Sequence, residues 1–267
     1  CLVPVGTLRS GSALLSLTTA GKSVSDADGM VMGALLKENR TLTELDMSSS
    51  ACSAEALRLI AEGLAVCPAP LAELLVSGVT HGDGETSVAA RLAALVKGAC
   101  RPTLHTLDCS KQQGTKAGEC ALFAGEGAGV VPLLCELMAR DGNALRAVRM
   151  GSNGKWPRGR AADLVAALGS SSCVVEELDL MGSELSASDA LALAKAGGTL
   201  QTLGIAQCLV PVGTLRSGGA ASLTTAGEAL SDADGMVVGA LLKENRTLTK
   251  LDMSSSACSA EALRLIA

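Results

Sequence analysis

The chain has 267 residues, of which 48% are apolar but only 1% aromatic, so its core must be built from aliphatic and small side chains. Its formal net charge of −5, with both signs mixed along the chain, argues against a nucleic-acid binder, which would carry a basic face. No run of about 18 uncharged apolar residues occurs, so we expect no membrane insertion.

Nine short segments share the spacing Leu-x-x-Leu-x-Leu, with other small residues at some of the three positions. In chain order they are Leu14-Leu17-Thr19, Leu42-Leu45-Met47, Leu71-Leu74-Val76, Leu104-Leu107-Cys109, Leu145-Val148-Met150, Val175-Leu178-Leu180, Leu200-Leu203-Ile205, Ala220-Leu223-Thr225 and Leu248-Leu251-Met253. Each predicts a short strand whose last two core residues point inward together, because residues two apart share a face. Parallel pairing between neighbouring repeats predicts one continuous curved sheet.

Between these strands the apolar spacing changes from two to about 3.6 residues, which predicts amphipathic helices. Examples of the predicted helical stretches are residues 26–39, 53–65, 85–99, 160–169 and 186–198. Ser25, Ser53 and Ser186 stand at N-cap positions, where a hydroxyl can accept a hydrogen bond from a free backbone N–H group.

A second, longer repeat contains the short one. Residues 17–61 return as residues 223–267, and the eleven residues from Cys1 return unchanged from Cys208. The differing pairs in the long match are Lys22/Glu228, Ser23/Ala229, Val24/Leu230, Met32/Val238 and Glu44/Lys250. We interpret residues 1–267 as a single solenoid, a fragment of a longer chain, in which residues 14–219 form one 206-residue super-repeat of seven short repeats. Residues 220–267 begin the next super-repeat.

Two steps between strands depart from the usual spacing. The 20-residue step from Leu200 to Ala220 contains Pro211 and Gly213, which we expect to leave no room for a helix. The 41-residue step from Leu104 to Leu145 is rich in glycine.

The segment ALLKENRTLTELDMSSSACSAEALRLIAEGL resembles the ribonuclease-inhibitor-like class of leucine-rich repeats, which also occurs in NOD-like receptors and Ran GTPase-activating proteins. The resemblance extends over essentially the whole chain. It implies an α/β solenoid, a horseshoe or superhelix, with parallel strands on the concave side and helices on the convex side. Ser50 and Ser256 replace the Asn or Cys usual after the strand. The Arg and Asn loop residues of the Ran activators have no counterpart that we can place.

No residue pattern indicates a catalytic site, a cofactor or a metal, because no C-x-x-C pair occurs and no histidine has a metal-ligand spacing. The ten cysteines are predicted to be mostly buried free thiols, which favours the cytoplasm over an extracellular location. Asn39 and Asn245 each fit N-x-[ST] at a corner expected to be exposed, and would be glycosylation sites only in a secreted protein.

Two candidate protein-contact sets remain. The first is an acidic stripe on the sheet face, which is either a solvated surface or a docking surface for a basic partner: Glu44, Asp46, Glu73, Asp108, Glu176, Glu177, Asp179 and Asp252. The second is a basic cluster around the only tryptophan, which is either a plain loop or a contact site with an aromatic anchor: Arg146, Arg149, Lys155, Trp156, Arg158 and Arg160.

The sequence therefore predicts a non-enzymatic structural or scaffolding solenoid, part of a fibre-like array. Its expected partners are proteins, further copies of itself among them, and not nucleic acid. The alternative is a receptor-type leucine-rich repeat domain that recognises another protein.

Overall fold

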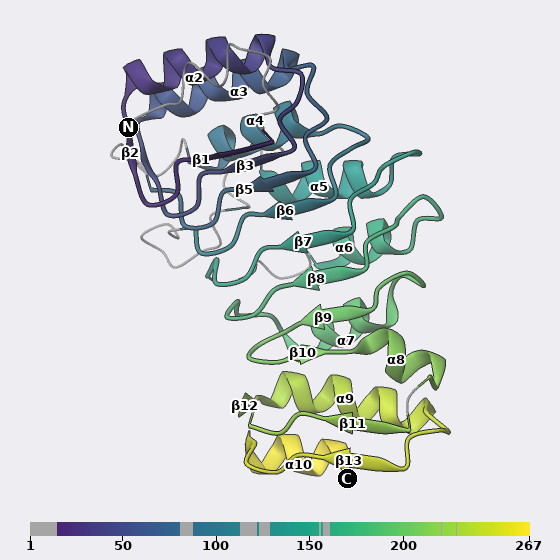
Figure 1. Cartoon of the computed structure of the whole chain (residues 1–267). Helices are drawn as coiled ribbons and strands as arrows, with labels where there is room; N and C mark the ends of the chain where they lie inside the picture. The colour runs from purple at the N-terminus through teal and green to yellow at the C-terminus, as the bar shows by residue number, and fades with distance from the viewer. Residues whose placement is uncertain are drawn as a thin grey trace.

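The structure, a computed structural model, describes residues 15–80, 88–112, 122, 129–154, 156, 161–219, 221–227 and 229–267. Short strands alternate with helices along the chain, and the helices lie against one face of the sheet while the other face is left open (Figure 1). This arrangement is the α/β leucine-rich repeat solenoid that the sequence predicts.

The main sheet has eight strands, in the order β1, β3, β5, β6, β7, β8, β9 and β10. Their bounds are β1 Ser16–Thr18, β3 Glu44–Asp46, β5 Glu73–Leu75, β6 Thr106–Asp108, β7 Ala147–Arg149, β8 Glu177–Asp179, β9 Thr202–Gly204 and β10 Leu209–Val210. Neighbours are parallel except β9 and β10. Leu45 lies opposite both Leu17 and Leu74, so the register aligns the middle residues of the predicted triplets.

The helices follow the strands as predicted, within a few residues at each end. Their bounds are α2 Asp26–Glu38, α3 Ala54–Val66, α4 Val88–Ala99, α5 Val130–Met138, α6 Ala161–Leu168, α7 Ala187–Lys195, α8 Val212–Ser217, α9 Asp232–Glu244 and α10 Ala260–Ile266. The side chains of Ser25, Ser53 and Ser186 each accept a hydrogen bond from a first-turn backbone N–H group, which confirms the three predicted N-caps. Helix α5 was not among the predicted helical stretches.

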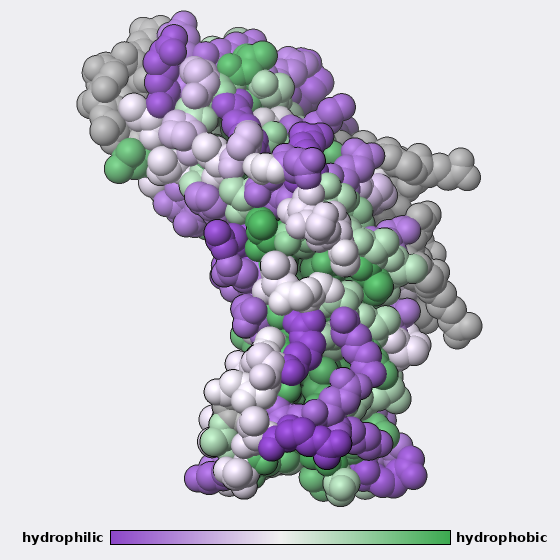
Figure 2. Space-filling model, turned by 90° about the vertical axis from the view of Figure 1, so that its right-hand side faces the viewer, coloured by the Kyte–Doolittle hydropathy of each residue, from purple (hydrophilic) through white to green (hydrophobic). Residues whose placement is uncertain are grey.

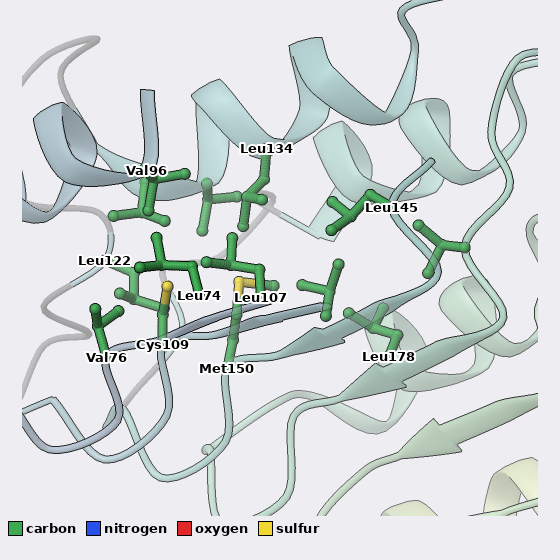
Figure 3. Close-up of a cluster of buried hydrophobic side chains, with 14 of the residues drawn as sticks. Leu74, Val76, Val96, Leu107, Cys109, Leu122, Leu134, Leu145, Met150 and Leu178 are labelled. Atoms are coloured by element: carbon green, nitrogen blue, oxygen red, sulfur yellow. The ribbon is translucent and has the colours of Figure 1, made fainter. Parts of the chain in front are cut away.

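The core lies between the sheet and the helices. Leu74 and Leu107 on the adjacent strands β5 and β6, and Leu178 on β8, point toward the helix side, where Val96 and Leu134 also lie (Figure 3). All five side chains are fully buried. Stacked aliphatic layers therefore supply the burial that a nearly aromatic-free chain needs.

A row of polar side chains, called the polar ladder below, runs beside this core. Each of these side chains lies eight positions after the first residue of its triplet. They donate hydrogen bonds to the carbonyl oxygen of the third core residue in the preceding repeat. The bonds are Ser50 to Thr19 (2.6 Å), Gln112 to Val76 (2.5 Å), Asn153 to Cys109 (3.1 Å) and Ser256 to Thr225 (2.5 Å). Ser50 and Ser256 therefore take a role in repeat stacking, although the sequence marked them as departures from the family pattern.

Except after β9 and β10, the turn that follows a strand of the triplet repeat has a residue with left-handed backbone geometry one position before the ladder position. The residues and their φ values are Gly21 (66°), Ser49 (54°), Gly78 (63°), Lys111 (57°), Ser152 (57°), Gly182 (69°), Gly227 (79°) and Ser255 (59°). This conformation is natural for glycine and strained for the serines and the lysine.

The sheet is not continuous, contrary to the sequence prediction. Strand β10 turns back and pairs antiparallel with β9, so it occupies the edge where the next parallel strand would bond. A new two-stranded sheet follows, in which β11 (Ser222–Thr224) pairs with β13 (Lys250–Asp252). Two further pairs of very short strands follow the turns: β2 (Ser23–Val24) with β4 (Ala51–Cys52), and β12 (Ala229–Leu230) with β14 (Ala257–Cys258).

The expectation that Pro211 and Gly213 exclude a helix is also wrong. Pro211 is the N-cap of the six-residue helix α8, a place where a missing N–H group costs nothing. A side chain at Gly213 would clash with Gln201, so this glycine permits close packing of the helix. The Arg216 guanidinium on α8 donates to the carbonyl oxygens of Ala196 (3.0 Å) and Gly197, just beyond the C-terminal end of α7.

Candidate interaction surface

The open face of the main sheet brings together most of the predicted acidic stripe. In one row across the strands, Glu44 lies beside Glu73, and Glu177 lies farther along on β8. In the next row, Asp108 lies beside Arg149, which lies beside Asp179. Asp252, by contrast, belongs to β13 in the separate sheet, so the stripe is divided between two sheets.

The aspartates of the stripe have a local structural role that the sequence did not reveal. The Oδ1 atoms of Asp46, Asp108 and Asp179 each accept a hydrogen bond from the backbone N–H group two residues later, at 2.8–2.9 Å. Asp252 makes the same contact at 3.0 Å. Each aspartate therefore stabilises the turn that follows its strand, as an Asx-turn.

Two members of the predicted basic cluster lie inside the acidic stripe rather than apart from it. Arg149 Nε donates to Glu177 Oε1 at 2.7 Å, and Arg146 forms an ion pair with Glu176. The hydrogen bond to Glu177 raises the pKa of Arg149, and the nearby carboxylates of Asp108 and Asp179 act in the same direction. The charges around β7 and β8 are thus largely compensated within the chain.

The opposite end of the sheet face carries uncompensated negative charge. Glu44, Asp46 and Glu73 lie on the adjacent strands β3 and β5. Glu44 and Asp46 are half-buried and Glu73 is exposed. None of the three forms an ion pair with another described residue, although Asp46 accepts a hydrogen bond from Thr18 Oγ1 at 3.3 Å.

The aromatic anchor proposed for the basic cluster is not on the surface. Trp156 is only 5% exposed and belongs to the core cluster, so its ring does not offer the exposed contact that the sequence suggested. Its backbone N–H group donates to Glu184 O in the next repeat at 3.3 Å. The remaining members, Lys155, Arg158 and Arg160, lie outside the described residues.

The corner asparagines are also less accessible than predicted. Asn39 is buried, and its Oδ1 atom accepts hydrogen bonds from the backbone N–H groups of Thr41 (2.9 Å) and Leu42 (2.8 Å). Asn245 repeats this pattern and donates from Nδ2 to Leu215 O at 2.7 Å. The helix-to-strand corners lie on the right-hand side of Figure 1, and hydrophilic residues are spread widely over that side in Figure 2. The side-chain amides of Asn39 and Asn245, however, form hydrogen bonds within the fold.

The cysteines within the described part of the chain are free thiols: Cys52, Cys67, Cys100, Cys109, Cys135, Cys173, Cys208 and Cys258. Burial raises the pKa of Cys52, Cys100 and Cys135 to about 12, and it also raises the pKa of Cys109. These thiols therefore stay protonated near neutral pH, and a protonated thiol is a poor nucleophile.

The described residues hold no group of three or more His, Cys, Asp or Glu side chains placed to bind a metal ion. In the same part of the chain, no helix combines the length and apolar character needed to cross a membrane.

The fold defines a leucine-rich repeat solenoid by its strand register, its core and its alternating helices. No protein-family model matches the sequence, and no curated protein matches it. Among solved structures, the chain is similar to an internalin (inlF) from Listeria monocytogenes, with 13% sequence identity, coverage of 97% of this chain and 86% of that chain, and a TM-score of 0.30.

Proposed function

We propose that the chain is a non-enzymatic scaffold that binds proteins through the open face of its main sheet. The observation that carries this proposal is the uncompensated group of carboxylates formed by Glu44, Asp46 and Glu73 on β3 and β5. Its partner is a basic, extended polypeptide segment.

The geometry suits such a segment because neighbouring strands lie about 4.8 Å apart, and an extended chain advances about 3.3 Å per residue. Lysine side chains on alternate residues can therefore reach carboxylates on adjacent strands. Among the described residues, the open face carries no Trp, Tyr or Phe, which usually anchor tight interfaces. Binding is consequently electrostatic, and its strength comes from several weak contacts acting together.

The absence of enzymatic activity is part of the proposal. The raised pKa of Cys52, Cys100 and Cys135 disfavours the thiolate form that nucleophilic catalysis requires. The free thiols also support a reducing compartment, and we propose the cytoplasm.

We further infer that the repeats are of the ribonuclease-inhibitor-like type and belong to an array of super-repeats. Full helices of 13 residues follow β1 and β3, which supports this repeat type over those with shorter convex segments. The near-identical second copy, whose helix α9 packs against α7, supports an array in which units follow one another.

The binding proposal is tested with a synthetic Lys-rich peptide of about 12 residues, extended enough to cross several strands. We expect saturable binding at low salt that is lost near 1 M salt, where the screening length is about 3 Å. The double variant Glu44→Lys and Glu73→Lys removes two attractions and adds two repulsions of about 0–1 kcal/mol each, so affinity should fall about tenfold or more.

The Glu44→Lys variant is expected to fold, because the second copy of the repeat has a lysine, Lys250, at the matching position. A control with the same change in net charge, Glu62→Lys with Glu136→Lys, places the lysines on exposed positions of helices α3 and α5. If this control weakens binding as much as the sheet-face variant does, the peptide responds to net charge alone and the proposed site is wrong.

A further inference from the structure

The two copies of the same helix differ in burial although they hardly differ in sequence. On α2, Met30 is 62% exposed and Val31 is 38% exposed. On α9, the corresponding Met236 is half-buried and Val237 is fully buried. Apolar side chains of one sequence are therefore covered in one copy and open to solvent in the other.

Helix α9 is covered mainly by α7, in the repeat of residues 175–207, and helix α8 also packs against it. Helix α9 packs against α7, and Val237 belongs to the hydrophobic core there. Polar contacts fix the register: Lys195 Nζ lies 3.2 Å from Glu244 Oε1, and the Ala206 backbone N–H group donates to Asp234 Oδ1 at 3.3 Å. Asp234 is fully buried as a result, yet it still caps its own helix.

Helix α2 retains every one of these contact groups. Asp28, Val31 and Glu38 are identical to their partners in the second copy. Within the helix only Met32 and Val238 differ, and both are fully buried. Met30, Val31 and Glu38 are exposed on α2, so the apolar face and the acidic group that meet α7 in the second copy are open to solvent there.

We propose that the outer face of α2 is a docking surface for the α7 repeat, residues 175–207, of another copy of the super-repeat placed N-terminal to it in the same polypeptide. A lysine at the Lys195 position meets Glu38, and α7 covers Met30 and Val31. This inference rests on the array organisation proposed above. It does not involve the open sheet face, so the peptide-binding test and the test below can fail separately.

The sequence itself shows how to build the test. Gln207 is followed by Cys208 and ten residues that are identical to the eleven residues starting at Cys1, so residues 14–207 can be joined ahead of Cys1 with the natural junction preserved. Single Val31→Cys and Val237→Cys variants are made in the 267-residue chain and in this extended chain, with Val31 and Val237 counted in the original copy. A maleimide reagent labels the native protein near neutral pH, and mass spectrometry of the α2 and α9 peptides gives each labelling rate.

We expect the cysteine at position 31 to label rapidly in the 267-residue chain and at least about tenfold more slowly in the extended chain, because the upstream α7 repeat covers it. The cysteine at position 237 should label slowly in both chains, which makes it the matched control. Equal rates at position 31 in the two chains would overturn the proposal. Labelling of position 31 that slows with increasing concentration of the 267-residue chain would also overturn it, because a second molecule would then be the occupant.

Discussion

The polar ladder makes a quantitative prediction at Asn153, which is fully buried in the fifth repeat. Its Oδ1 atom accepts from the Gln112 backbone N–H group at 2.7 Å, and its Nδ2 atom donates to Met150 O at 2.7 Å and to Cys109 O at 3.1 Å. The bonds to Gln112 and Cys109 join two successive repeats, and the bond to Met150 lies within one. Asn153→Ala removes all of them at once and leaves the Gln112 N–H group buried without its acceptor.

A buried hydrogen bond contributes about 1 kcal/mol net, and a buried group left unsatisfied costs about 1–3 kcal/mol. The free energy of unfolding should therefore fall by about 3–5 kcal/mol in Asn153→Ala. Ser50→Ala, at the same ladder position in the second repeat, loses the 2.6 Å bond to Thr19 O, and the expected loss is about 1 kcal/mol. The difference between these two variants isolates the effect of the larger network.

Urea denaturation measures both changes. Far-UV circular dichroism follows the whole chain, and the fluorescence of the buried Trp156, three residues from Asn153 and the only tryptophan, reports on the fifth repeat. Asn153→Asp provides a control of equal size, which keeps an acceptor for Gln112 but loses the two donated bonds and introduces a charge. If Asn153→Ala loses less than about 1 kcal/mol, or no more than Ser50→Ala, the ladder does not join the repeats as described.

Two further predictions concern the turns and the thiols. Gly182→Ala should destabilise the chain more than Gly21→Ala, because both glycines have left-handed geometry but only a methyl group at position 182 would meet another atom, Ser152 Oγ at 2.6 Å; similar melting temperatures for the two variants would refute this steric explanation. The unfolding free energy should also fall as the pH rises from about 8.5 toward 12, because thiols ionise in the unfolded chain near 8.5 but have pKa values of about 12 when folded. If urea titrations show an unchanged unfolding free energy over this pH range, the thiols of Cys52, Cys100 and Cys135 have ordinary pKa values in the folded chain.

Much of the fold follows from the sequence because the core signal is strong and regular. The residues centred on Leu45, Leu107 and Leu178 were assigned to strands from spacing alone, and these are the residues that the strand register aligns. The serine N-caps were also predicted from the sequence, since a hydroxyl directly before an apolar helix is well placed to accept a hydrogen bond from a first-turn N–H group.

The errors arise where a residue has two physical roles. Pro211 and Gly213 usually interrupt helices, but here one caps a helix and the other allows it to approach Gln201. Trp156 has charged and loop-forming neighbours in the sequence, yet its ring is buried. Asn39 fits a glycosylation motif, but its amide organises the corner.

The arrangement of the candidate interaction surface was predicted only in part. Most of its acidic residues lie on strands of the main sheet, whereas Asp252 lies on a separate sheet, and a single strand does not reveal which arginine its neighbours bring beside each carboxylate. Arg149 and Glu177 are 28 residues apart in the chain and become ion-pair partners only through the register of β7 and β8. Aligning the repeats by their triplets would have indicated this pairing, and it would also have indicated the ladder and the left-handed turn positions.

Carbodiimide cross-linking of the Lys-rich peptide to the native chain tests the proposed docking surface most directly, because the reagent joins a lysine amine to a carboxylate only when the two are in contact. Mass spectrometry of the products should place the cross-links at Glu44, Asp46 and Glu73, and they should disappear near 1 M salt. Cross-links spread evenly over the helix side, with Glu62 and Glu136 modified as often as Glu44, would contradict a binding site on the open sheet face.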